Sequence, residues 1–125
     1  MTAVGRFICC MVAAAAMLIS AIVDVRAAGA FAVGSCGAYG YSYDYPEPEA
    51  ARRAAINQCS GECKIVPVRR ACAALAVDAT NACGAHGYAT APKLSSAQNT
   101  ALKQCYEYGG NDCMIRAWIC DAKGG

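Results

Sequence analysis

The sequence predicts an exported α+β domain made of two strand-strand-helix-strand repeats, with two short helices packed on an antiparallel or mixed sheet and disulfides stapling the whole. Three observations predict it. The chain begins with an apolar segment typical of export, an even number of cysteines follows it, and those cysteines recur as two sets of four at a nearly constant offset. The sets are Cys36, Cys59, Cys63 and Cys72, then Cys83, Cys105, Cys113 and Cys120.

Residues 1–27 have the features of a signal peptide. Arg6 precedes a strongly apolar run over residues 7–23, and the small residues at Val25 and Ala27 offer a cleavage site. A membrane anchor is the alternative, because the run is close to the minimum of about 17 residues that can cross a bilayer. We expect cleavage, a periplasmic or extracellular product, and no stable membrane span afterwards.

Cleavage would leave residues 28–125, which suffice for one small domain. Eight cysteines in so short an exported chain predict a disulfide framework, because a small domain buries too little surface to be comfortably stable alone. Nine basic and eight acidic residues leave a formal charge of +1 without a basic stripe. This balance gives no indication of a nucleic-acid partner.

The two repeats, residues 31–72 and 75–120, open in nearly the same way. The segment CGAYGY at 36–41 matches CGAHGY at 83–88 in five of six positions, and its glycines indicate a bend that leads into a strand. The apolar runs that precede these segments predict the first strand of each repeat. We therefore expect a strand, a bend and a second strand at the start of both repeats.

A short helix follows in each repeat. Small and apolar residues fall on one helical face in both, at Ala51, Ala55, Ile56 and Cys59 and again at Ala97, Ala101, Leu102 and Cys105. Glycines then provide the backbone conformation that ends a helix. Such a face needs a sheet to pack on.

The last strand of each repeat is predicted over residues 64–68 and 114–119. Pro67 cannot donate a ladder hydrogen bond, so its strand should lie at a sheet edge or carry a bulge. Trp118, in the second of these strands, is expected to anchor the core.

Eight cysteines allow 105 pairings, so the connectivity stays open on sequence alone. The short, glycine-containing connections favour two local bridges, Cys59 with Cys63 and Cys105 with Cys113, because a helix end and the next strand can approach to about 5.5 Å between Cα atoms. The remaining cysteines can pair across the repeats or within them. We favour pairing within repeats, which gives Cys36 with Cys72 and Cys83 with Cys120. The expected mature chain contains no C-x-x-C, which argues against a zinc site and against thiol redox catalysis.

The order of these segments resembles that of a known family. The resemblance rests on the alanine-rich helix closing on Cys59, the glycine turn, the strand CKIV at 63–66, the run ACAALA at 71–76, and a second helix that ends at Cys105 before a glycine pair. On these features the chain resembles small exported bacterial proteins classed as domain of unknown function forty-one eighty-nine. The resemblance implies export and a compact domain, and it brings no catalytic residues to transfer.

Four tyrosines alternate with smaller residues over residues 39–45, which on a strand projects their rings from one face. Tyr41 has a counterpart in Tyr88 and is expected in the core. Tyr43 and Tyr45 align with Thr90 and Pro92, so they are the candidates for an exposed binding role.

His86 is the sole histidine and takes the place of Tyr39 in the shared segment. Because no serine, cysteine or carboxylate lies at a recognisable companion spacing, we expect neither an enzyme nor a bound cofactor. The sequence favours a non-catalytic binding module for a cell-envelope glycan or protein. An inhibitor or immunity-type protein against a secreted enzyme is an alternative, and a hydrolase using His86 is a less favoured one.

Overall fold

The computed structural model describes residues 28–121, so the expected signal peptide lies outside the described residues. The first unit contains β1 (Ala28–Val33), β2 (Tyr39–Tyr45), α2 (Pro48–Gln58) and β3 (Lys64–Val68). The second contains β4 (Cys72–Asp78), β5 (His86–Ala91), α3 (Leu94–Glu107) and β6 (Cys113–Cys120). The predicted α+β fold of two strand-strand-helix-strand units is confirmed. The second unit begins at Cys72, slightly earlier than the expected residue 75, because residues 72–77 all belong to β4.

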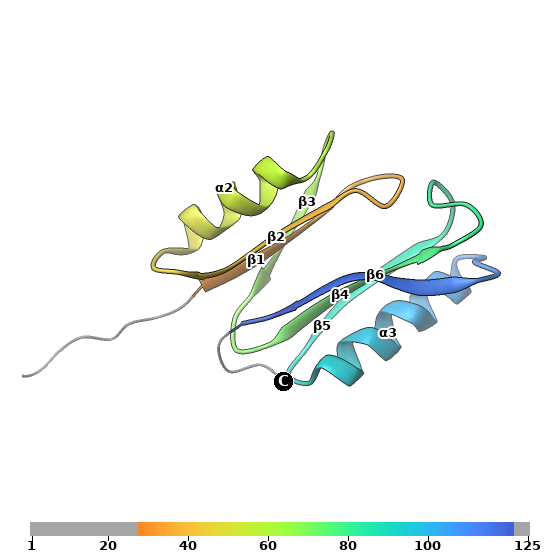
Figure 1. The fold of residues 1–125 in the computed structure, drawn as a ribbon. Coiled ribbons are helices and arrows are strands. Elements are labelled where there is room, and N and C mark those ends of the chain that lie inside the picture. Colours follow the sequence, from red (N-terminus) through yellow and green to blue (C-terminus); the bar gives the residue numbers. More distant parts are fainter. Residues whose placement is uncertain (1–27, 122–125) are drawn as a thin grey trace, which may run out of the picture.

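The strands form two three-stranded antiparallel sheets, one from each unit, with the orders β2-β1-β3 and β5-β4-β6. Figure 1 shows the sheets packed against each other, with α2 outside the first and α3 outside the second. The fold therefore has four layers, and the first strand of each unit lies at the centre of its sheet. This position explains why β1 and β4 are buried along their whole length.

Side chains on β1 and β4 alternate between two kinds of contact, as the pleat of a strand requires. One set, which includes the larger side chains, points between the sheets: Phe31, Val33, Ala73, Leu75 and Val77. Together with Val68 of β3 and Ile119 of β6, this set forms the central core. The other set faces the helices: alanines of β1 meet Ala51 and Ala55, and those of β4 meet Ala97 and Ala101. Alanine on both sides lets each helix lie very close to its sheet.

The close approach is duplicated in detail. The backbone of Gly40 packs against the carbonyl of Ala55, and that of Gly87 packs against the carbonyl of Ala101. At the same level of each helix a glutamine side chain reaches the outer strand. The Gln58 Oε1 accepts a hydrogen bond from the Tyr41 amide at 3.2 Å, and the Gln104 Oε1 accepts one from the Tyr88 amide at 3.2 Å.

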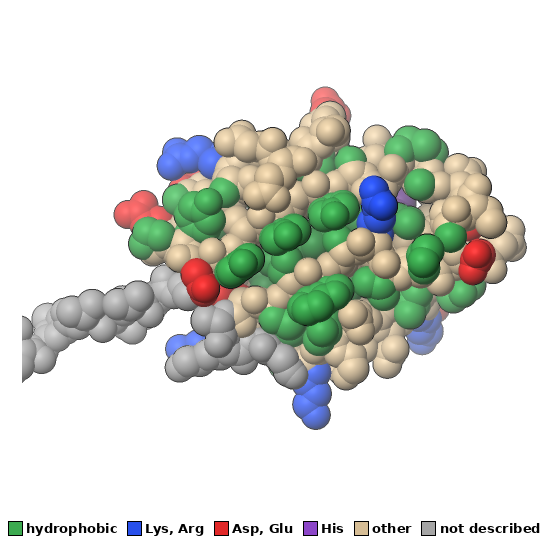
Figure 2. All heavy atoms as spheres, viewed as in Figure 1, with side chains coloured by type: hydrophobic (Ala, Val, Ile, Leu, Met, Phe, Trp, Pro, Cys, Tyr) green, Lys and Arg blue, Asp and Glu red, His purple; other side chains and the backbone are tan. Residues whose placement is uncertain are grey.

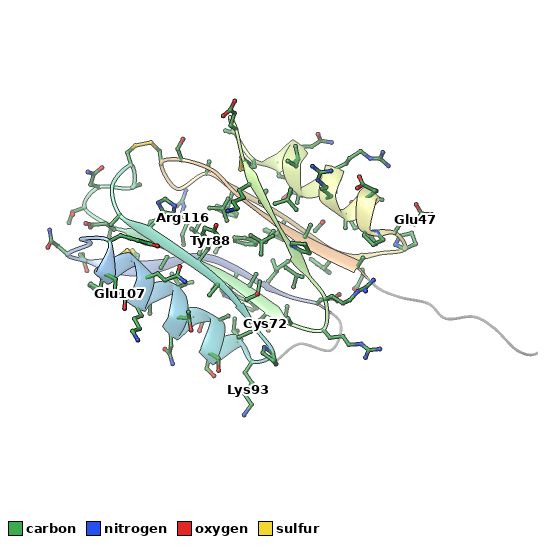
Figure 3. The ribbon with its side chains drawn as sticks, turned by 180° about the vertical axis from the view of Figure 1, so that it is seen from behind. Glu47, Cys72, Tyr88, Lys93, Glu107 and Arg116 are labelled. Atoms are coloured by element: carbon green, nitrogen blue, oxygen red, sulfur yellow. A yellow bond between two sulfur atoms is a disulfide. The ribbon has the colours of Figure 1, made fainter. Side chains whose placement is uncertain are left out.

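Four disulfides join the described cysteines. Two are local and confirm the bridges favoured by the short connections: Cys59 with Cys63, with Cα atoms 6.4 Å apart, and Cys105 with Cys113, at 6.1 Å. The others are Cys36 with Cys83 and Cys72 with Cys120. The first of these connects the turns of the two hairpins, and it is the yellow bond at the upper left of Figure 3. Four disulfides indicate an oxidising, extracytoplasmic compartment.

The expected pairs Cys36 with Cys72 and Cys83 with Cys120 are wrong. Because β1 and β3 are antiparallel, Cys36 lies near the start of β3 and Cys72 lies beyond its end. A five-residue strand at about 3.3 Å per residue separates them by far more than the roughly 7 Å limit between bridged Cα atoms. The eight residues of β6 separate Cys83 from Cys120 in the same way. Cys72 and Cys120 instead lie opposite each other on neighbouring strands.

Within residues 28–121, no helix is both long and apolar enough to span a membrane.

Candidate binding face

The two open edges of the sandwich occupy equivalent positions. Strand β2 lies beside β6 at one edge, and residues of β3 and β5 line a shared hollow at the other. Exchanging the two units turns β2 into β5 and β6 into β3, so one edge takes the place of the other. Any difference between the edges is therefore specific to one of them and not a requirement of the common fold.

A row of aromatic rings runs along the first edge. It begins at the buried Phe31 and continues through Tyr39, Tyr41 and Tyr43 on β2, with successive ring centroids 6.5, 6.3 and 6.4 Å apart and planes within 12° of parallel. Exposure increases along the row, to 38% at Tyr41 and 54% at Tyr43. Tyr41 is thus not a core residue as the sequence suggested, because this side of β2 faces the second sheet and β6 covers it only in part.

The row ends at Tyr43 because the strand is irregular at the next residue. Asp44 has a positive φ of 59°. Ala30 of β1 pairs with Ser42, but Ala28 pairs with Tyr45, so β2 contains one extra residue between these two pairs. An extra residue in a strand re-aims the side chains beyond it. Tyr45 is exposed as expected, but among the described rings it makes no stacking contact with Tyr43.

Arg116 comes from a second irregularity, on β6. Ala117 lies opposite Leu75, while Ile115 lies opposite Ala76, so Arg116 is an extra residue with no partner of its own on β4. Its side chain crosses to the first sheet. The Arg116 Nε donates to the Gly37 carbonyl at 3.4 Å, and the guanidinium carbon lies 5.6 Å from the centre of the Tyr39 ring.

Trp118 lies on the same strand and is 51% exposed, so its expected place in the core is wrong. It sits opposite Ala74, on the side of the sheet that faces α3. Because α3 packs mainly over β4 and β5, the outer part of β6 is left partly open. We name Tyr39, Tyr41, Tyr43, Arg116 and Trp118 the aromatic face, and all except Tyr43 line one open hollow. Figure 2 looks onto this side and shows hydrophobic side chains gathered over β2 and β6, with a basic side chain at the end of the row.

The sequence reasoning missed Arg116 and Trp118, although a signal was present. In the segment MIRAWI at 114–119, Met114, Arg116 and Trp118 alternate with smaller or aliphatic residues. These three are exposed, and their neighbours are at least partly buried. Weighing this alternation above the general preference of tryptophan for the core would have placed Trp118 on the surface beside Arg116.

The second edge keeps a tyrosine at one corresponding position, Tyr88, and differs at the others. By strand register, His86 and Tyr88 take the places of Tyr39 and Tyr41, and Thr90 follows where Tyr43 would be. Pro67 occupies the place of Trp118, and β3 pairs with β1 without any extra residue, so Arg116 has no counterpart. The exposed aromatic row and the arginine therefore belong to one edge alone.

His86 lies exposed between two hollows at this second edge, and Tyr88 borders both. Within residues 28–121, no hydrogen bond or ion pair connects His86 to another side chain. A histidine acting as a base needs a partner that orients it and a reacting group within reach. In the same range, no group of three or more histidine, cysteine or acidic side chains is placed to hold a metal ion.

Comparison with known proteins finds a matching family model. The family model described as domain of unknown function (DUF4189) matches residues 28–120, which is nearly the whole of the described structure. Neither the curated proteins nor the solved structures contain a significant match to this chain.

Proposed function

The chain belongs to the family described as domain of unknown function DUF4189, and from that premise we propose that it is a non-catalytic binding module that docks a protein of the cell envelope on its aromatic face. The observation that carries the proposal is the concentration of exposed tyrosine, tryptophan and arginine at one of two equivalent edges. These residue types dominate the energetic centres of protein interfaces. Tyrosine and tryptophan also combine a large apolar surface with a polar tip.

The rigidity of the face supports this role. The Tyr39 ring stacks between the rings of Phe31 and Tyr41, and the Arg116 guanidinium lies over it. The Cys36–Cys83 bridge fixes the two turns beside Gly37, to which Arg116 is hydrogen-bonded. Side chains that are already ordered lose little conformational entropy when a partner binds. A small stapled domain is well suited to present such a surface outside the cytoplasm.

The test is retention of the purified processed protein on isolated cell envelopes. We expect the Tyr43→Ala, Trp118→Ala double variant to bind at least about thirtyfold more weakly than the wild type, since truncating a central interface aromatic typically weakens binding by that factor or more. The matched control is the His86→Ala, Thr90→Ala variant, which alters the equivalent edge and should be retained like the wild type. Equal retention of all three proteins would overturn the proposal.

Pretreatment of the envelopes identifies the partner class. If the partner is a protein, protease treatment removes the binding and digestion of the glycan leaves it. The reverse result would make the face a glycan-binding surface and overturn the choice of a protein. An inhibitor of an exported enzyme would be one form of protein-binding module, and stoichiometric loss of a hydrolase's activity would identify it.

A further inference from the structure

We propose that the hollow beside Arg116 is a carboxylate-binding subsite. It is filled by an acidic side chain of the protein partner, and the partner residues next to that acid are apolar. The inference deepens the proposed function and rests on it for the identity of the partner as a protein. Its starting point is charge. Of the residues that line this hollow, Arg116 alone is charged, and the others are Tyr39, Tyr41, Gln98, Ile115, Ala117 and Trp118.

The guanidinium of Arg116 is held in place but not neutralised. Its Nε–H donates to the Gly37 carbonyl, and its plane is supported by the Tyr39 ring. Within the described residues, no carboxylate forms an ion pair with it. The terminal N–H groups of the fork are therefore left for an outside acceptor. A guanidinium fork matches the two oxygens of a carboxylate and binds them through charge-assisted hydrogen bonds.

The surroundings strengthen such a contact. Aromatic and aliphatic side chains border the arginine on β2 and β6. When a ligand covers them, water is displaced and a charge-assisted hydrogen bond gains strength in the lower dielectric. The exposed ring of Trp118 and the edge of Tyr41 then offer apolar surface for the residues next to the acid. This combination favours an acidic side chain with apolar neighbours over a free inorganic anion.

The hollow at the other edge lies nearer the start of β3 and has a different charge pattern. It is lined by Glu62 and Lys64 together, with His86 in place of Tyr39. Opposite charges in one hollow leave no net preference for an anion. Arg116, the extra residue of β6, thus adds to the first edge a cation that the repeated fold itself does not require.

The subsite is tested with peptide probes on the folded, oxidised protein, read by NMR at the Arg116 Nε–H and at the indole N–H of Trp118. The probes are acetyl-Leu-Glu-Leu-amide, its Gln analogue, and the Gln analogue with a free C-terminus. We expect saturable shifts with the Glu peptide and at least about tenfold weaker binding of the Gln amide, because the two differ only in one charge-assisted contact. Added salt should weaken the binding of the Glu peptide more than that of the Gln analogue.

Variants locate the contact. Arg116→Gln should remove the preference for Glu over Gln, while Arg69→Gln, at an exposed arginine in the turn after β3, should keep it. Equal binding of the Glu and Gln peptides to the wild type overturns the subsite, whatever the variants do, and so does the absence of any shift. Preference for the free C-terminus would overturn the assignment to an acidic side chain. Failure of the proposed function is a separate result, namely unchanged envelope retention of the Tyr43→Ala, Trp118→Ala variant.

Discussion

The carbonyl oxygen of Ala55 occupies the space that a side chain on Gly40 would need, so helix α2 rests directly on the backbone of β2. Gly87 and Ala101 repeat the relationship in the second unit. In each case the obstacle is helical backbone, which cannot move aside as the end of a flexible side chain could. The glycine is therefore a condition for the helix to lie close enough for its alanines to pack.

Gly87→Ala should destabilise the domain by roughly 2–4 kcal/mol, because the added methyl group forces α3 away from β5. The measurement is urea unfolding of the oxidised protein. Gly109→Ala is the control, since its side chain would meet open space and would bear only the strain of a left-handed backbone at φ 100°. That strain is about 1 kcal/mol. Similar losses in the two variants would contradict the packing argument.

Intact mass should show that the purified processed protein contains no free thiol. Alkylation without reductant should leave the mass unchanged, and alkylation after reduction and unfolding should add eight labels, in keeping with four disulfides among the described residues. Partial proteolysis of the oxidised protein should release Cys36 and Cys83 in one linked product. A product linking Cys36 to Cys72 would refute the connectivity.

Replacing Cys36 and Cys83 by alanine should reduce the free energy of unfolding about twice as much as replacing Cys59 and Cys63. The chain-entropy model gives about 4 kcal/mol for the first bridge and about 2 kcal/mol for the second, because their sequence separations are 47 and 4 residues. Denaturant titrations of the two double variants measure this difference. A larger loss for the short bridge would show that burial of Cys59 outweighs loop closure.

Asp78 should make stability depend on acid. The hydroxyl of Thr80, and then the amides of Thr80 and Asn111, donate to its carboxylate and hold the pKa of Asp78 below its ordinary 3.8. A lowered pKa in the folded state stabilises the fold above 3.8, and this contribution is lost as the pH falls through the folded value. Asp78→Asn should therefore be less stable than the wild type at neutral pH, and the difference should narrow below 3.8.

Unfolding midpoints at neutral pH and at about pH 3 measure this narrowing. Asp112→Asn is the control, because Asp112 accepts the Ala79 amide through its backbone carbonyl and its side chain is exposed. A difference in unfolding midpoint between the wild type and Asp78→Asn that stays constant with pH would contradict the assigned hydrogen bonds.

Trp118→Ala should lose no more than about 2 kcal/mol of stability, although tryptophan is the largest side chain. Half of its surface is already in water. Phe31→Ala, at the buried start of the same aromatic row, should lose roughly 3–5 kcal/mol. Thermal or urea unfolding separates the two outcomes. A loss at Trp118 comparable to that at Phe31 would mean that the ring supports the fold and is not a surface for recognition.

The duplicated unit, its helices and its local bridges could be predicted because they depend on short-range patterns. Helical periodicity placed Ala51 and Ala55 on one face, and a short glycine-containing connection brought Cys59 to Cys63. The long-range bridges could not be predicted in this way. The pairing of Cys36 with Cys83 depends on two sheets packing face to face, and no spacing within one repeat encodes that arrangement.

The candidate site was predicted only in part. Tyr43 was expected to be exposed and is, since its counterpart Thr90 marked the position as free to vary within the fold. Tyr41 was assigned to the core because of its counterpart Tyr88, and Trp118 because of its residue type, but both lie on outer strands that are only partly covered. The position of Arg116 depends on a one-residue register shift between β4 and β6. The sequence does not reveal this shift, because the two repeats already differ in length.

The equivalence of the two edges has a consequence for how such a protein can change over generations. Central strands, helix contacts and bridges carry the folding of both units, while the outer surface of β2 and β6 contributes little to it. Substitutions there can alter what is recognised without endangering the scaffold. Relatives of this domain should therefore diversify fastest at these surface positions, and the architecture could serve as a framework onto which new specificities are engineered.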